Sequence, residues 1–234
     1  LNRPARHNAL IPELLSQLLT SFQHQHCQTA RAVILRAEGH SFSTGGDIAG
    51  FQQHRNAIAA YSQQLVGLLN QVIMTIYTHP APVVCAVHGQ VSGGSLGLLL
   101  ASDHVIMRRD MTITPYYGVV GFSPDGGWTA LLPGIIGRQQ AMNWLAGNQS
   151  YTADACMAMG LVHQVVEQDC DAAARAWADR ITKMQTGSIG SSRKLINTNS
   201  DELSQRLEAE RVAFVHQIQT QQAVDGIDQF LRRH

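Results

Sequence analysis

The stretch over residues 83–103 constrains the fold more than any other part of the chain. It begins with a continuous apolar run, Val83–Val87, that has the length of a buried strand. A glycine-rich turn follows, and a second apolar segment comes directly after it. This order predicts a strand, a tight turn and a buried helix. Gly93 and Gly94 are consecutive in the turn, and because glycine has no Cβ, another molecule can approach the backbone closely there.

The first turn of the expected helix suits a negatively charged oxygen. Its backbone N–H groups have no intrahelical partner, and the aligned peptide dipoles make this end of the helix electropositive. The same glycines also fit a turn that only allows close helix packing. They do not fit a dinucleotide fingerprint, because their spacing differs from Gly-x-Gly-x-x-Gly. An anion site and a structural turn are therefore the two interpretations of this stretch alone.

Composition argues against several classes of function. Lysine and arginine together number 17 and equal the 17 acidic residues, so bulk charge favours neither a nucleic-acid partner nor a membrane surface. No segment has the roughly 20 apolar residues of a transmembrane helix and no signal peptide opens the chain, which predicts a cytoplasmic protein. His24 and His26 are two apart at a helix end and point in different directions, so no metal site is predicted. The scattered cysteines are expected to be reduced, namely Cys27, Cys85, Cys156 and Cys170.

Hydrophobic periodicity organises the chain into an α/β core followed by helices. Helices are predicted over 12–23, 57–77, 128–132, 138–145, 152–159 and 201–219, and strands over 31–37, 83–87, 103–107, 111–114 and 161–166. Loops are expected over 39–48 and 118–127, and Gly147 is expected to cap the helix that precedes it. Everything from Cys170 onward has a helical pattern. We therefore divide the chain into a core, 1–169, and a helical C-terminal region, 170–234.

Five motifs occur in a fixed order along the chain. They are LNRP with NAL (1–4 and 8–10), FSTGGDI (42–48), AVHG with two glycines (86–89 and 93–94), GFSPDGG (121–127) and ADACMAMGLVHQVV (153–166). Their order and spacing resemble the enoyl-CoA hydratase/isomerase, or crotonase, family, and the motif pattern is closest to its Δ3,Δ2-enoyl-CoA isomerases. The resemblance implies an α/β spiral of ββα units, a helical C-terminal region used in trimerisation and an acyl-CoA thioester substrate. Family members begin with strands before the first motif, so we expect these N-terminal strands to be missing here.

The resemblance also implies the family's oxyanion hole. Two backbone N–H groups hold the thioester carbonyl as it becomes an enolate, and the matching positions are Gly46 and Gly94. Each such donor contributes about 3 to 4 kcal/mol when charge develops on the oxygen. Further substrate-binding residues follow from the same matches, and these are Arg6, Thr44, Asp47, Ile48, Tyr117 and Phe122. Coenzyme A belongs to the substrate, and no separate cofactor is expected.

Carboxylates decide which reaction the enolate enters. Hydratases of the family use two glutamates, but the matching positions here hold Gly97 and either Tyr116 or Tyr117. None of these residues can act as a carboxylate base, so the addition of water lacks its usual catalysts.

Asp125 instead matches the single catalytic carboxylate of the family's isomerases. One carboxylate suffices for a 1,3-proton shift, and we expect Phe122 and Trp128 to raise its pKa as apolar neighbours. Without the resemblance, Pro124-Asp125-Gly126 equally fits a turn chosen for its conformation.

Four other side chains have alternative interpretations. We expect His88 to hold its loop by a hydrogen bond rather than to titrate in the site. Arg3 near the start of the chain, like Arg6, fits either coenzyme A phosphates or an ordinary solvated surface. Arg232 and Arg233 fit a contact with a neighbouring subunit's coenzyme A or a frayed terminus.

The function predicted from these residues is an enoyl-CoA isomerase of fatty-acid or related acyl-CoA metabolism, assembled as a homotrimer or dimer of trimers. The alternatives within the family are a hydratase, that is a lyase, and a decarboxylase or thioesterase that needs mainly the oxyanion hole. From a different class, a non-catalytic acyl-CoA-binding subunit also fits the missing glutamates.

Overall fold

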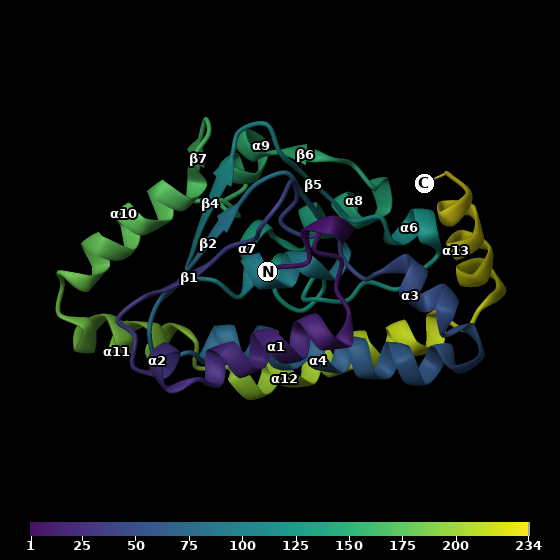
Figure 1. Ribbon diagram of the computed structural model, residues 1–234, viewed down its shortest axis with the longest axis horizontal. Helices are drawn as coiled ribbons and strands as arrows, with labels where there is room; N and C mark the ends of the chain where they lie inside the picture. Colours follow the sequence, from purple (N-terminus) through teal and green to yellow (C-terminus); the bar gives the residue numbers. More distant parts are fainter. Residues whose placement is uncertain (234) are drawn as a thin grey trace.

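Two small sheets form the centre of the protein in a computed structural model that describes residues 1–233 (Figure 1). In the larger sheet, β2 (Val83–Val87) pairs in parallel with β1 (Val33–Leu35) on one side and β4 (His104–Arg108) on the other. β7 (Gln164–Val166) extends the sheet beyond β4, which gives the order β1-β2-β4-β7. Every residue of β2 is buried, which explains its continuous apolar run, since helices cover both faces of the strand.

The second sheet contains two short strands that the sequence analysis missed. β3 (Gln90–Ser92) pairs in parallel with β5 (Thr112–Thr114), and β6 (Tyr151–Thr152) adds an antiparallel edge. β3 lies inside the predicted turn and is only three residues long, which is too short for an alternating pattern to be recognised. The predicted helix then follows as a short 3₁₀ turn, η3 (Gly93–Ser95), and α5 (Leu96–Leu100).

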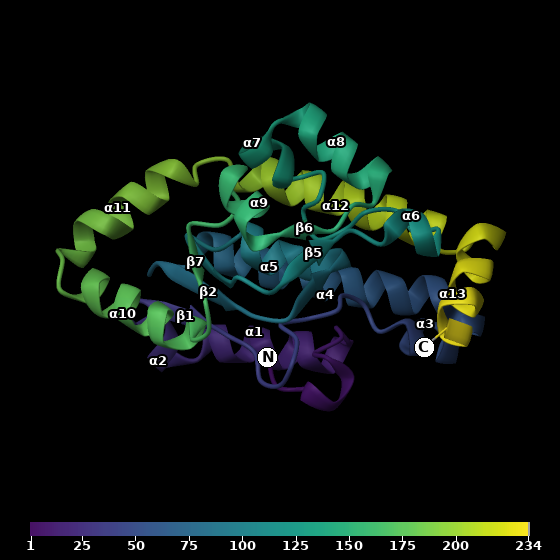
Figure 2. The ribbon, with the colours of Figure 1, turned by 90° about the horizontal axis from the view of Figure 1, so that it is seen from above.

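Helices pack on the two sheets from opposite sides (Figures 1 and 2). α4 (Ile58–Thr78) lies between α1 (Pro12–Gln23) and α12 (Ser200–Gln217), and all three use the apolar faces that their periodicity predicts. α10 (Cys170–Thr182) covers the other face of the larger sheet, where its buried Ala174 packs among strand residues. The proposed division of the chain at residue 170 stays a prediction.

The other helical elements connect these layers. They are η1 (Pro4–Arg6), α2 (Gln25–Gln28), α3 (Ile48–Gln53), η2 (Arg55–Ala57), α6 (Tyr117–Val120), α7 (Leu132–Ile136), α8 (Arg138–Gly147), α9 (Ala153–Ala158), α11 (Thr186–Ile196) and α13 (Gln221–Arg233). No helix within residues 1–233 combines the length and the apolar character that crossing a bilayer requires.

Three local predictions were wrong. The helix predicted over 128–132 is a series of turns, and α7 begins only at Leu132; a buried side chain from α12 accepts hydrogen bonds from the backbone of these turns. The loop predicted over 118–127 contains the single turn α6, which ends at Gly121 with a φ of 73°. Gly147 is the last residue of α8 rather than its cap, and Asn148 takes the left-handed conformation instead, with a φ of 48°.

Close backbone contact docks α13 at the end of the molecule opposite α10 (Figure 2). Its Gly226 packs on α6 so tightly that a Cβ there would lie 2.1 Å from the carbonyl oxygen of Val120. Gly121 faces α13 in the same way, since its Cβ would lie 2.8 Å from the oxygen of Gln222. α13 also contacts α3, so it joins two segments that are far apart in the sequence.

The contact at Gly226 predicts a sharp difference between two alanine variants. Gly226→Ala must push α13 away from α6 and should lower the free energy of unfolding by about 1–3 kcal/mol. Gly134→Ala is the control, because no atom lies within 4 Å of its Cβ position in α7 and alanine is favoured in a helix. Urea unfolding of both variants measures the difference, and equal midpoints would contradict the tight contact.

Candidate active site

A pocket of about 720 Å³ opens between the 44–48 loop, the central turn and the segment that leads to Asp125. Its size is typical of a small-molecule site. It gathers every residue that the sequence analysis assigned to substrate or catalysis: Arg6, Thr44, Gly46, Asp47, Ile48, Gly94, Tyr117, Phe122 and Asp125. Phe230 and Leu231 of α13 also line it, so the last helix contributes to its wall.

The two loops with the predicted amide donors are in direct contact. The Ser43 amide donates to the Gln90 oxygen at 3.1 Å, and the Ser92 amide donates back to the Ser43 oxygen at 3.2 Å. Gly45 has a φ of 78°, and a Cβ there would lie only 2.6 Å from the Ser92 oxygen. This contact places Gly46, which follows Gly45, and Gly94, two residues after Ser92, in the same pocket.

The amides of these two glycines are available to a ligand. Within residues 1–233, no carbonyl or side chain accepts a hydrogen bond from the Gly46 amide. Gly94 lies in the first turn of η3, where no intrahelical carbonyl can accept from its N–H group. Two donors that converge on one substrate oxygen stay a prediction.

Asp125 lies against the central turn through another close backbone contact. Gly126 has a φ of 64°, and a Cβ there would lie 2.3 Å from the Gly94 oxygen. A Cβ on Gly94 would in turn lie 2.8 Å from Asp125 Oδ1 and 2.9 Å from Oδ2. Only glycine at position 94 therefore leaves room for the carboxyl group. The indole N–H of Trp128 donates to the Gly93 oxygen at 2.8 Å and fixes the turn from the same side.

The environment of Asp125 changes its protonation. The side chain is buried, and Tyr117 donates a hydrogen bond to Oδ1 at 2.5 Å. Burial raises the pKa of Asp125 to about 7, the Tyr117 hydrogen bond opposes this rise, and the nearby charge of Glu210 adds to it. A carboxyl group with a pKa near neutrality can both accept and return a proton.

Tyr117, not Tyr116, faces the Asp125 carboxyl. Tyr117 is buried and bonded to Asp125, whereas Tyr116 is 42% exposed and takes a left-handed φ of 65°. Trp128 packs on Tyr117 with its ring centre 6.0 Å away.

Gly97 has no space for the glutamate that a hydratase would carry there. A Cβ at this position would lie 2.4 Å from the Gly126 oxygen and 2.5 Å from Ile73 Cδ1. The sequence lacks this glutamate, and the structure leaves no room for its side chain at position 97.

Glu210 is a site neighbour that the sequence analysis missed. It is buried on α12 and accepts hydrogen bonds from the amides of Gly127, Thr129 and Ala130 and from the Thr129 hydroxyl, at 2.7 to 2.9 Å. A signal was present, because this acidic residue takes a core position in the apolar spacing of Leu203, Leu207 and Phe214.

The charged residues at the pocket entrance form one cluster. Arg3 and Arg6 both pair with the buried Asp47, at 2.8 and 3.4 Å. Burial alone would raise the pKa of Asp47, but the hydrogen bond and charge of Arg3 and the charge of Arg6 lower it overall. Asp47 also accepts from the Ala49 amide and so caps α3. His88 holds its loop as expected, through a contact of 2.8 Å between Nε2 and the Gly39 oxygen.

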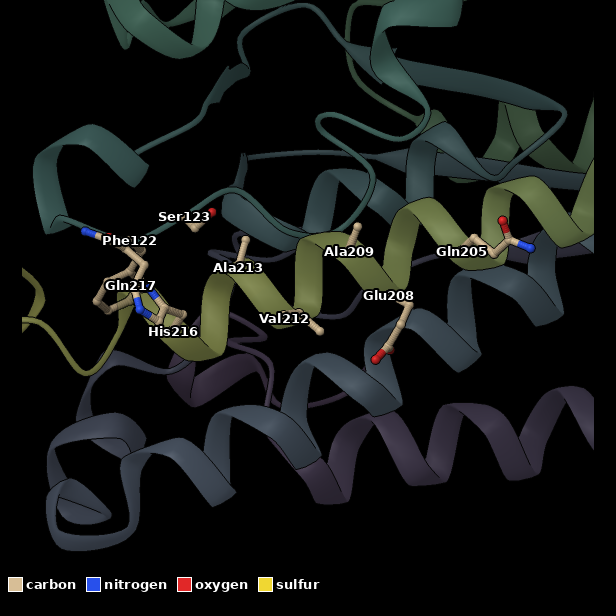
Figure 3. A pocket seen from close by; sticks show the side chains of 9 residues that line it. All are labelled: Phe122, Ser123, Gln205, Glu208, Ala209, Val212, Ala213, His216 and Gln217. Atoms are coloured by element: carbon tan, nitrogen blue, oxygen red, sulfur yellow. The ribbon is translucent and has the colours of Figure 1, made fainter.

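A second groove, of about 890 Å³, runs along α12 outside this pocket (Figure 3). Phe122 contributes to both, and the other lining residues are Ser123, Gln205, Glu208, Ala209, Val212, Ala213, His216 and Gln217. Neither Gly46 nor Gly94 lines this groove, and its one carboxylate is that of Glu208. No group of three or more potential metal ligands occurs within residues 1–233.

Tyr117→Phe should raise the pKa of Asp125 further. The tyrosine hydrogen bond stabilises the carboxylate, so its loss favours the protonated acid. Carboxyl titration of Asp125 by ¹³C NMR measures the effect directly. Tyr151→Phe is the matched control. Tyr151 lies on the edge strand β6, and this variant removes a hydroxyl that donates to Gln149. A lowered or unchanged Asp125 titration in Tyr117→Phe would contradict the assigned hydrogen bond.

Comparison with known proteins identifies the fold and the family. The family model described as enoyl-CoA hydratase/isomerase matches residues 1–234. 1,2-Epoxyphenylacetyl-CoA isomerase of Escherichia coli (strain K12) is 30% identical over 220 residues, which cover 90% of this chain and 82% of that protein. 4-Chlorobenzoyl coenzyme A dehalogenase-2 of Arthrobacter sp is 28% identical over 175 residues, which cover 71% of this chain and 61% of that protein. The crystal structure of enoyl-CoA hydratase from Bacillus halodurans superimposes with a TM-score of 0.89 at 23% identity, covering 97% of this chain and 92% of that one. The chain therefore belongs to the enoyl-CoA hydratase/isomerase family and has the crotonase fold with its helical C-terminal region.

Proposed function

We propose that this acyl-CoA enzyme is an isomerase that converts 3-enoyl-CoA into 2-enoyl-CoA. The observation that carries the proposal is the buried carboxyl of Asp125, which is packed against Gly94 in the pocket, has a pKa of about 7 and is not paired with a cation as Asp47 is. A 1,3-proton shift needs one group that accepts a proton and returns it. The isomerase among the relatives supports the same reaction class.

The proposed proton transfer uses the two carboxylate oxygens differently. Tyr117 occupies Oδ1, so Oδ2 is the oxygen that takes the proton from C2 of the substrate. The electron pair left at C2 spreads over the thioester and the former double bond, and the Gly46 and Gly94 amides stabilise the charge on oxygen. Oδ2 then returns the same proton at C4, and the double bond forms between C2 and C3.

Hydration is less well supported than isomerisation. Addition of water needs groups that hold and activate the water molecule. The two positions that would supply glutamates carry Gly97, which is enclosed by its neighbours, and Tyr117, whose hydroxyl is bonded to Asp125. Asp125 alone can move one proton within the substrate.

A second reaction has one specific observation in its favour. The dehalogenase among the relatives acts on 4-chlorobenzoyl coenzyme A by its name, and a carboxylate can act as a nucleophile. Both a nucleophile and a base must be ionised, but burial raises the pKa of Asp125 to about 7, which makes its carboxylate a stronger base whose proton can also be returned near neutral pH. A carboxyl of this kind is better matched to proton transfer.

Assembly and cofactor use complete the proposal. We propose a homotrimer or a dimer of trimers, which is supported by exposed apolar side chains on the C-terminal helices, Leu195, Ile196 and Val212. Val212 lies in the groove of Figure 3, where a partner surface would cover it. The reaction needs no metal and no cofactor beyond the coenzyme A of the substrate.

The direct test is a paired assay with 3-enoyl-CoA and 2-enoyl-CoA. The purified protein should convert the 3-enoyl substrate into the conjugated 2-enoyl thioester, which absorbs in the ultraviolet, and should not hydrate the 2-enoyl substrate. Halide release from 4-chlorobenzoyl-CoA is followed in parallel. Hydration or halide release without isomerisation would overturn the proposal, as would acyl-CoA binding with no reaction.

Asp125→Asn should abolish isomerisation, keep acyl-CoA binding and stabilise the fold above neutral pH. The native pKa of about 7 lies above the ordinary value of 3.8, so wild-type stability falls as pH rises between these values. Asparagine has no such cost, and its advantage should reach a few kcal/mol, on the order of magnitude that such a shift implies. Thermal unfolding of both proteins from about pH 4 to 8 measures it. A constant difference between the two proteins at every pH would contradict the assigned pKa.

A further inference from the structure

Glu210 is the buried acidic group that the proposed proton transfer does not use. It projects from α12 into the turns over 127–130, which follow Asp125 directly in the chain. Three of its four donors are backbone amides, and amides can only donate. The side chain therefore has to accept in every one of these bonds, which matches a carboxylate and not a protonated acid.

The Glu210 carboxylate anchors the backbone of this segment. It accepts from the amides of Gly127, Thr129 and Ala130, which precede α7 and have no helical carbonyl to bond to. Arg206, one turn earlier on α12, donates to the Thr129 oxygen and holds the same residue from its other side. The path of the backbone after Asp125 thus depends on α12.

The charge of Glu210 also acts on the reacting group. The titratable groups that affect Asp125 are Tyr117, whose hydrogen bond favours the carboxylate, and Glu210, whose negative charge favours the acid. Burial raises the pKa of Glu210 itself, and the hydrogen bonds from Thr129, Gly127 and Ala130 oppose that rise. These four hydrogen bonds stabilise the Glu210 carboxylate and so keep a second negative charge close to Asp125.

We propose that Glu210 is a positioning residue for Asp125, which fixes the 127–130 backbone from α12 and so sets the place and the protonation of the Asp125 carboxyl beside Gly94. The kinetic part of this inference rests on the proposed isomerase function, and the titration part does not. A role in folding alone would leave the protonation of Asp125 unchanged.

The test compares Glu210→Gln with Glu208→Gln. Glutamine keeps the shape of the side chain but removes its charge and leaves only one oxygen to accept. Glu208 is the matched control, because it lies on the same helix, is half-exposed, pairs with Arg211 and lines the two surface grooves along α12 rather than the pocket of Asp125.

Glu210→Gln should lower kcat for 3-enoyl-CoA by about tenfold or more, because small displacements of a reacting group are costly, while KM changes less than about threefold. The acid limb of the pH profile should move to lower pH, since the loss of a nearby negative charge lowers the pKa of Asp125. Carboxyl titration of Asp125 by ¹³C NMR should move in the same direction. Glu208→Gln should match the wild type in all three measurements.

Thr129 provides a second pair of variants that keeps the test decisive if Glu210→Gln does not fold. Thr129→Val removes the hydroxyl that donates to Glu210 at 2.7 Å, and Thr129→Ser retains it. The valine variant should lose kcat at nearly constant KM, and the serine variant should restore it. Equal kcat values in this pair would contradict the positioning role.

The outcomes separate the two proposals. An unchanged Asp125 titration and unchanged kcat in folded Glu210→Gln overturn the role of Glu210, whatever the wild type catalyses. A wild type that does not isomerise 3-enoyl-CoA overturns the proposed function, whereas an Asp125 titration that moves in Glu210→Gln still supports the role of Glu210.

Discussion

Direct backbone contact between the central turn and the Asp125 loop is the constraint on which the site depends. Gly94 and Gly97 on one side meet Gly126 on the other at distances that exclude any Cβ. The contact brings η3 and α5, which follow β3, against a loop about 30 residues later in the chain. Because backbone rather than side chains sets the separation, the carboxyl and the amide donors are held by the stiffest parts of the fold.

The same packing explains the electrostatics of the site. The Asp125 carboxyl is buried beside Gly94, so it is desolvated and binds its proton more tightly than an exposed aspartate. A buried carboxyl destabilises the folded state once it is ionised. The protein carries this cost in the candidate active site, while the ion pairs with Arg3 and Arg6 lower the pKa of Asp47, another buried carboxyl that lines the same pocket.

Sequence patterns predicted what is repeated or continuous and missed what depends on distant partners. β2, α1 and α4 follow from an apolar run and two amphipathic periods, and their ends agree with the prediction to within a residue. The resemblance predicted the family and the residues of the site, and the structure places these residues in one pocket. The turns over 128–131 have a helical composition, and their amides bond to Glu210, which lies some 80 residues later. The choice between Tyr116 and Tyr117 likewise needed the left-handed backbone at Tyr116, which no local pattern indicates.

The docking of α13 has a consequence for the order in which the chain becomes functional. Phe230 and Leu231 of this helix line the pocket, although the glycines and Asp125 lie more than 100 residues earlier in the sequence. During synthesis, the glycines and Asp125 therefore leave the ribosome long before α13, which encloses the pocket. A nascent chain can form its central sheet early, yet it gains an enclosed binding site only after α13 has emerged and packed against α6 and α3.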